Sequence, residues 1–258
     1  MATYRTGPNE FVWGKIKGLQ YRVLLPEAFD RFNAEILGLG DLTKPSKSVD
    51  AIAAVFDLSG FTNFCKQIEP HLSVPAFLND FLNWMMTRLK YEMKKGNHKK
   101  GVALWNPLPF LIKFLGDGLL VLWDSSEMGD VERRNVIISA GEICSTYKKE
   151  FLPSVRRKYV DPPSALRCGL ARGTVYSIGD EKDYVGSCIN MAARLEKLPG
   201  ITFAFNCRGF DIDTPFFVKK LVVKDIAIRG IGDHELIAIL KSQFESMRAN
   251  DRSLFRPV

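Results

Sequence analysis

The stretch VDAIAAVFDLSGFT, residues 49–62, decides the fold. Residues 49–56 form a mostly apolar, β-prone run, which predicts a buried strand. Asp57 ends this strand, and a turn containing Gly60 then leads into a helical pattern. The free backbone N–H groups of such a turn form a natural cradle for phosphate oxygens. The stretch therefore predicts a carboxylate and a phosphate-binding turn at one end of a buried strand.

A second carboxylate, Asp117, stands at the tip of an expected hairpin. Residues 109–123 have the pattern of two strands joined by Gly116-Asp117-Gly118. If this hairpin neighbours the strand 49–56, Asp57 and Asp117 converge, and two like charges at close range repel unless cations join them. Each element alone is more often structural, because Asp-Gly tips and helix-capping aspartates are common. Together they predict a site for Mg²⁺ or Mn²⁺, the ions that phosphoryl transfer needs.

A third motif is DYVGSCINMAAR, residues 183–194, in which a short expected strand runs into a helix. Asn190 and Arg194 lie at positions i and i+4 of that helix, so both side chains can face one cleft. Taken alone, the helix would be interpreted as a core element with Arg194 in a surface ion pair.

The segments VFDLSGFT (55–62), KFLGDG (113–118) and DYVGSCINMAAR (183–194) resemble, in order and spacing, the catalytic domains of class III nucleotidyl cyclases. The resemblance runs from about residue 48 to residue 240 and implies a ferredoxin-like, palm-type α+β fold. Irregular alternation of strands and helices, with hairpin links, independently favours a mostly antiparallel sheet with packed helices. We therefore expect an N-terminal head over residues 1–48, a catalytic domain over 49–245 and a C-terminal tail over 246–258.

The resemblance also implies roles for individual residues. Two divalent ions, Mn²⁺ or Mg²⁺, would be held by Asp57, Asp117 and the backbone carbonyl of Leu58. Catalysis would depend on Asn190, which positions the ribose, and on Arg194, which donates to the α-phosphate as charge builds there. Substrate binding is implied for seven residues, namely Phe56, Ser59, Gly60, Phe61, Thr62, Lys113 and Asp183.

In this family the ribose 3′-oxygen attacks its own α-phosphate and pyrophosphate leaves, so catalysis is positioning and charge neutralisation. The family's active site lies between two subunits, which implies a homodimer with two equivalent shared sites. One departure concerns the lysine that grips the terminal phosphate in many mammalian-type members. Isoleucine stands at that place, in Arg229-Gly230-Ile231-Gly232, and Arg229 or Lys224 could substitute for it.

The two residues expected to recognise the base do not determine which base the substrate carries. Lys113 as donor and Asp183 as acceptor suit adenine, and they also suit the carbonyl and N3–H groups of uracil. A second, looser resemblance covers the head and the stretch from GSCIN (186–190) to CRGFD (207–211). It is to the bacterial pyrimidine cyclases of Pycsar anti-phage systems, whose cyclic UMP or cyclic CMP is read by a separate effector.

This second resemblance favours conversion of UTP to cyclic UMP. The alternative is an adenylate cyclase that makes cyclic AMP from ATP. An inactive nucleotide-binding sensor is the alternative of a different class, and it would be expected to lack a metal aspartate or Arg194.

Composition limits the remaining classes of protein. The 258 residues are 46% hydrophobic, enough for a sizeable core. The net charge of +7 attracts polyanions, but no interleaved aromatic and basic stripe is present, so we expect a small polyanionic substrate and no stable nucleic acid partner. The sequence contains no run of about 18 apolar residues, so no membrane span is expected. Five cysteines without metal-ligand spacing indicate reduced thiols in the cytoplasm.

Two further stretches give expectations that the structure can test. Residues 94–101 are expected to form a basic loop. Residues 166–178 are expected to form a pair of strands around Gly173.

Overall fold

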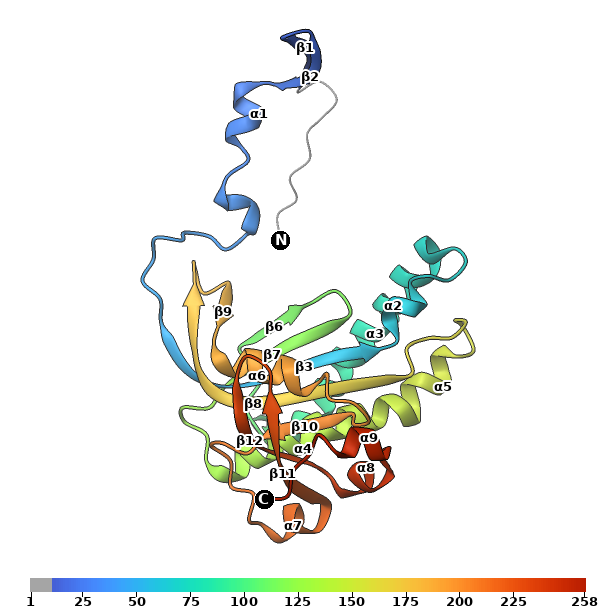
Figure 1. The fold of residues 1–258 in the computed structure, drawn as a ribbon. Helices are drawn as coiled ribbons and strands as arrows, with labels where there is room; N and C mark the ends of the chain where they lie inside the picture. The colour runs from blue at the N-terminus through green and yellow to red at the C-terminus, as the bar shows by residue number, and fades with distance from the viewer. Residues whose placement is uncertain (1–10) are drawn as a thin grey trace. The chain divides into compact units, whose positions relative to one another are not determined.

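The computed structural model describes residues 11–258, which form two units (Figure 1). The first unit runs up to Ser48 and also includes Tyr176–Val185, whereas the second comprises Val49–Val175 and Gly186–Val258. The first unit holds the antiparallel hairpin of β1 (Phe11–Ile16) and β2 (Leu19–Leu24), helix α1 (Pro26–Asp30) and the 3₁₀ turn η1 (Ala34–Leu37). It thus takes in a short piece of the chain that the sequence analysis assigned to the catalytic domain.

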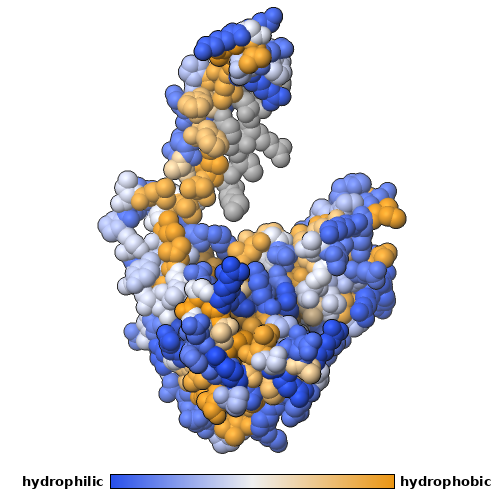
Figure 2. Space-filling model, viewed as in Figure 1, coloured by the Kyte–Doolittle hydropathy of each residue, from blue (hydrophilic) through white to orange (hydrophobic). Residues whose placement is uncertain are grey.

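The hairpin β1–β2 exposes a row of apolar side chains, and Figure 2 shows apolar surface along this part of the chain. The strand register places Val12 opposite Val23, and Ile16 opposite Leu19. All four side chains are exposed by 42% or more. A two-stranded hairpin of this kind is marginally stable in water by itself.

The main sheet has eight strands, and its order is β11-β12-β10-β8-β3-β7-β6, with β9 paired to the end of β8. Strand β10 runs parallel to β8, whereas the pairs β3–β7, β6–β7, β10–β12 and β11–β12 are antiparallel. The sheet is therefore mostly antiparallel, as expected for the α+β class. The strand bounds are β3 (Ser48–Ser59), β6 (Leu111–Phe114), β7 (Gly118–Asp124), β8 (Ala165–Ile178), β9 (Asp183–Val185), β10 (Phe203–Asn206), β11 (Leu221–Ile228) and β12 (Gly232–Leu240).

The core lies between this sheet and two long helices, α3 (Pro70–Met93) and α4 (Asp130–Thr146). Helix α3 buries a stripe at four-residue spacing, which comprises Phe77, Phe81, Met85, Leu89 and Met93. In β3, Ile52, Ala54 and Phe56 join this core, while Ala51, Ala53 and Val55 are buried as well. Burial on both faces explains why β3 is a continuous apolar run without alternation.

The remaining helical elements are short. They are α2 (Phe61–Phe64), the π-helical turn η2 (Tyr147–Phe151), α5 (Leu152–Val155), α6 (Ser187–Leu195), α7 (Pro215–Lys220), α8 (Lys241–Ser246) and α9 (Ala249–Arg252). Within residues 11–258, no helix is both long enough and apolar enough to cross a bilayer.

Two expectations about local structure were wrong. Residues 94–101 do not form a loop, because β4 (Lys94–His98) pairs with β5 (Gly101–Leu104) as a separate two-stranded sheet. Residues 166–178 are not a hairpin but lie within the single 14-residue strand β8. Gly173 lies inside this strand, where an added Cβ would approach the Cβ of Cys188 on α6 to 3.3 Å. Glycine at this position therefore allows a helix to pack closely and does not mark a turn.

Candidate active site

Asp57 and Asp117 lie at the same end of two neighbouring strands. The register of β3 and β7 places Asp57 opposite Gly118, and the Leu58 N–H donates to the Asp117 carbonyl at 3.1 Å. A Cβ added to Gly118 would lie 1.9 Å from the Phe56 carbonyl oxygen, so the close approach of the strands requires glycine there. Both aspartates are partly exposed. The strand pairing thus brings together two residues that are 60 positions apart in sequence (117 − 57).

Two charged residues next to Asp57 were missed by the sequence analysis. Arg167 of β8 donates to Asp57 Oδ2 at 2.6 Å and lies 3.5 Å from Glu196 Oε2. The Glu196 side chain, just after α6, is only 3% exposed. Its burial, and next the negative charge of Asp57, raise the pKa of Glu196 to about 7.

The sequence contains weak signals for both residues. Arg167 is a lone charge in an otherwise apolar run, and Glu196 is an acid at a helix C-terminus, where the helix dipole disfavours it.

The donors around Asp57 fit divalent cations such as Mg²⁺ or Mn²⁺. Among residues 11–258, no three His, Cys, Asp or Glu side chains are grouped so as to hold a metal ion by themselves. Two carboxylates and a backbone carbonyl match an ion that takes its other ligands from phosphate and water. Asp57 already has a cationic partner in Arg167, which indicates that this carboxylate is placed to neutralise positive charge.

The turn after β3 connects the strand directly to α2. Gly60 has φ of +90°, a left-handed conformation that glycine adopts without strain. The Ser59 carbonyl accepts from the Ser164 N–H at 3.0 Å, which fixes the turn to the start of β8. Thr62 is exposed and Phe61 partly buried. Phe56 differs from the others, because its side chain has no exposed surface and only its backbone can face a ligand.

Helix α6 presents Asn190 and Arg194 outward. Both residues are exposed, while Met191, Ala192 and Leu195 are buried on the opposite side. The helix lies tightly on β8, because a Cβ added to Gly169 would lie 2.0 Å from the Ala192 carbonyl oxygen. Within the described part of the chain, Arg194 forms no ion pair with either aspartate. The two residues therefore share a face, as their spacing predicts.

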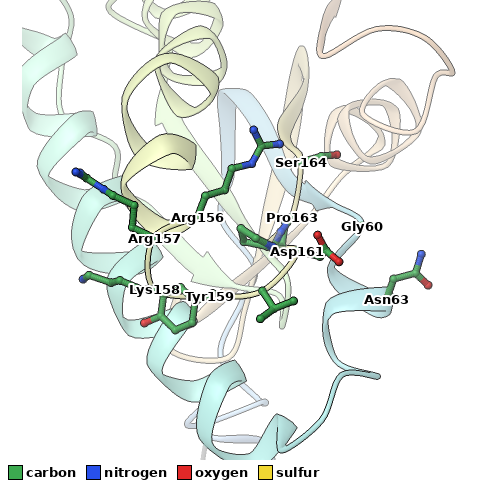
Figure 3. Close-up of a pocket in the computed structure, with 11 residues that line it drawn as sticks. Gly60, Asn63, Arg156, Arg157, Lys158, Tyr159, Asp161, Pro163 and Ser164 are labelled. Carbon is green, nitrogen blue, oxygen red and sulfur yellow. The ribbon is translucent and has the colours of Figure 1, made fainter.

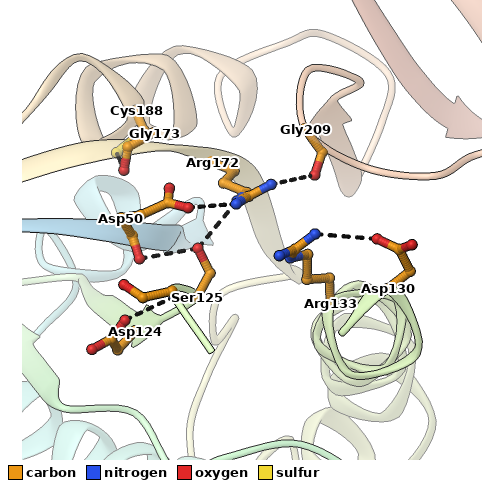
Figure 4. Close-up of polar contacts among 10 residues, drawn as sticks. Asp50, Asp124, Ser125, Asp130, Arg133, Arg172, Gly173, Cys188 and Gly209 are labelled. Atoms are coloured by element: carbon orange, nitrogen blue, oxygen red, sulfur yellow. Dashed lines mark hydrogen bonds and ion pairs between the residues drawn. The ribbon is translucent and has the colours of Figure 1, made fainter. Parts of the chain in front are cut away.

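A partly buried polar network at the other end of β3 fixes the strands in register (Figure 4). Arg172 of β8 pairs with Asp50 and donates to Ser125 Oγ at 3.1 Å and to the Gly209 carbonyl at 3.0 Å. Ser125, just after β7, donates its N–H to the Asp50 carbonyl at 2.7 Å. Since this network joins β3, β7 and β8, it holds the strand pair that carries Asp57 and Asp117.

The residues expected to recognise the base lie on short strands. Lys113 is part of β6, opposite Leu120 of β7. Asp183 begins β9, and its carboxylate accepts from the Tyr184 N–H at 2.9 Å. Of the two residues considered for the terminal phosphate, Arg229 is exposed, whereas the Lys224 ammonium lies 4.8 Å from the ring centroid of Phe244.

The chain is similar in structure to several solved cyclases, although its sequence matches no protein-family model and no curated protein. The adenylyl cyclase CyaB from P. aeruginosa is 17% identical, with a TM-score of 0.56 over 76% of this chain and 96% of that one. The guanylyl cyclase Cya2 is 17% identical, with a TM-score of 0.55 over 76% of this chain and 94% of that one.

A monomeric crystal structure of the guanylyl cyclase domain of the RhoGC fusion protein, from the aquatic fungus Blastocladiella emersonii, is 19% identical. Its TM-score is 0.50 over 76% of this chain and 98% of that one. The chain therefore has the palm-type class III cyclase fold, as the sequence analysis expected.

Proposed function

We propose that the protein is a nucleotidyl cyclase, which converts a nucleoside triphosphate into a 3′,5′-cyclic nucleotide and pyrophosphate. The observation that carries this proposal is the position of Asp57 and Asp117 at adjoining strand ends, beside the Gly60 turn, in a cyclase fold.

The proposed roles follow from the chemistry of each group. Asp57, Asp117 and the Leu58 carbonyl would hold two divalent ions, which supply neutralisation of the triphosphate and activation of the attacking hydroxyl when bound. Asn190 orients the ribose, and Arg194 donates to the α-phosphate oxygens as negative charge builds there. The 3′-hydroxyl gives up its proton to solvent and its oxygen forms a bond to the α-phosphorus. The bond to the bridging oxygen breaks, and its electron pair leaves with pyrophosphate.

We further propose a homodimer with two shared sites. Asn190 and Arg194 are exposed on the outside of α6, where they can reach the substrate of a second chain. In such a two-fold arrangement each site takes its aspartates from one chain and Asn190 and Arg194 from the partner.

For the base, we favour UTP, with cyclic UMP as an anti-phage messenger that a separate effector reads. The support is the resemblance to pyrimidine cyclases, together with a donor and an acceptor, Lys113 and Asp183, that suit uracil. Adenylate cyclase activity is the second candidate, because the same pair suits adenine and the structurally similar CyaB is an adenylyl cyclase. The presence of both aspartates and Arg194 speaks against an inactive sensor.

The first experiment measures pyrophosphate release from ATP, GTP, CTP and UTP with Mn²⁺, and identifies the product by mass spectrometry. We expect cyclic UMP from wild type, and no turnover from Asp57→Asn or Asp117→Asn with an unchanged circular dichroism spectrum. Asp124→Asn, at the opposite end of β7, is the matched control and should stay active. Turnover in either site variant would contradict the metal assignment, and nucleotide binding without turnover in wild type would favour a sensor.

A further inference from the structure

A pocket of about 680 Å³ lies beside the phosphate-binding turn (Figure 3). Gly60 and Asn63 form one wall, and residues 156–164, which connect α5 to β8, form the rest. Because Gly60 belongs both to this pocket and to the turn that follows Asp57, the pocket adjoins the proposed phosphate site.

The walls of this pocket are fixed by hydrogen bonds at several points. Ser164 donates its N–H to the Ser59 carbonyl at 3.0 Å, and the Gln67 side-chain amide donates to the Val160 carbonyl at 2.6 Å. Further back, the Tyr159 hydroxyl donates to Asp80 at 3.0 Å. A cavity whose walls are already held in place binds a ligand with little further ordering.

The charge of the lining is mainly positive. It contains Arg156, Arg157 and Lys158, against a single acid, Asp161. Lys158 is paired with Asp80 at 2.9 Å, whereas Arg156 and Arg157 form no ion pair within residues 11–258. The end of a helix favours cations in general. That preference explains why cations follow α5. It does not explain why they line a pocket whose walls are fixed and which adjoins the phosphate-binding turn.

We propose that this pocket binds an oligophosphate, with Arg156 as the principal cation. In Figure 3 the Arg156 side chain extends toward Ser164, and both residues are exposed. A guanidinium matches phosphate oxygens with two parallel hydrogen bonds, which is the geometry that oligophosphate recognition needs. The identity of the anion rests on the proposed function, because a nucleotidyl cyclase binds a triphosphate and releases pyrophosphate. The anion is either the end of the substrate's triphosphate or the released pyrophosphate.

The test is calorimetric titration of the full-length chain with inorganic pyrophosphate in EDTA, so that no metal ion contributes. The double variant R156A/R157A should lose about tenfold or more in affinity, because charge-assisted hydrogen bonds are removed. The matched control is K148A/K149A, which removes the same charge from an exposed pair on η2. It should bind pyrophosphate within about twofold of wild type.

Steady-state kinetics then distinguish the two sources of the anion. A raised KM for the triphosphate in R156A/R157A would assign the pocket to the substrate tail, and weakened inhibition by pyrophosphate at unchanged KM would assign it to the product. Equal affinity in wild type and R156A/R157A, or an equal loss in K148A/K149A, would overturn the proposal. The titration does not require turnover, so its result can be interpreted even if the cyclase assay detects no product.

Discussion

At the scale of single residues, the site is defined by one cation between two acids. Arg167 contacts Asp57, which is partly open to solvent, and also approaches Glu196, which is buried. Burial disfavours the charged form of a carboxylate, and this raises the pKa of Glu196. The same arginine therefore contacts one partly exposed acid and approaches one buried acid whose pKa is about 7.

The raised pKa of Glu196 predicts a pH-dependent contribution to stability. Its pKa is about 7 in the folded chain and ordinarily 4.5, so between these values the folded state holds a proton that the unfolded state has lost. The stabilisation is complete below pH 4.5 and is lost as pH rises through 7. Between pH 5 and pH 8, the unfolding free energy of wild type should therefore fall relative to that of Glu196→Gln, by up to about 3 kcal/mol.

Urea denaturation in EDTA measures this difference. Glu245→Gln, at an exposed position on α8, is the control and should follow wild type at every pH. Parallel profiles for wild type and Glu196→Gln would show that Glu196 does not titrate in this range.

At the scale of elements, the pairing of β3 with β7 positions Asp57 and Asp117 at adjoining strand ends. The Gly60 turn, the Gly116-Asp117-Gly118 tip and the buried run before Asp57 carry local signals of turn type and periodicity, so these elements could be predicted. Arg167 and Glu196 could not be placed next to Asp57, because the contact joins β8, α6 and β3 across 110 positions or more. Gly173 was misinterpreted for a related reason, since only the tertiary packing of α6 distinguishes a close approach from a turn.

Gly118→Ala tests the importance of this strand pair. The added Cβ would meet the Phe56 carbonyl oxygen, so the strands must separate, and we expect a loss of about 3 kcal/mol in unfolding free energy together with loss of turnover. Gly96→Ala in β4 is the matched control, because its Cβ would meet no atom within 4 Å. Chemical denaturation of both variants measures the effect. Equal denaturation midpoints for Gly118→Ala and Gly96→Ala would show that a Cβ at residue 118 does not clash with the Phe56 carbonyl oxygen.

At the scale of the whole molecule, the proposed site is divided between two chains. The fold is shared with solved adenylyl and guanylyl cyclases over 76% of the chain, but the fold does not determine which base is recognised. Base recognition depends on side chains such as Lys113 and Asp183, which are partly buried and whose chemistry suits more than one base.

Complementation tests the shared site. Asp57→Asn and Arg194→Ala should each be inactive alone, because every homodimer then lacks one half of each site. In an equal mixture about half of the dimers are mixed, and each has one whole site of two, so about a quarter of wild-type turnover should return. Native mass spectrometry verifies that mixed dimers form, and their inactivity would exclude a site divided in this way.

The contact between Arg167 and Asp57 has a consequence for how the proposed cyclase would take up divalent ions. Because the Arg167 guanidinium pairs with Asp57, it reduces the repulsion between the two aspartates, so the protein should remain folded when divalent ions are chelated. A divalent ion held by Asp57 would have to compete with that guanidinium. It would compete best in complex with a triphosphate, whose negative charge could receive the displaced arginine. Cellular supply of the nucleotide–metal complex, more than of free ions, would then govern when the proposed cyclase becomes active.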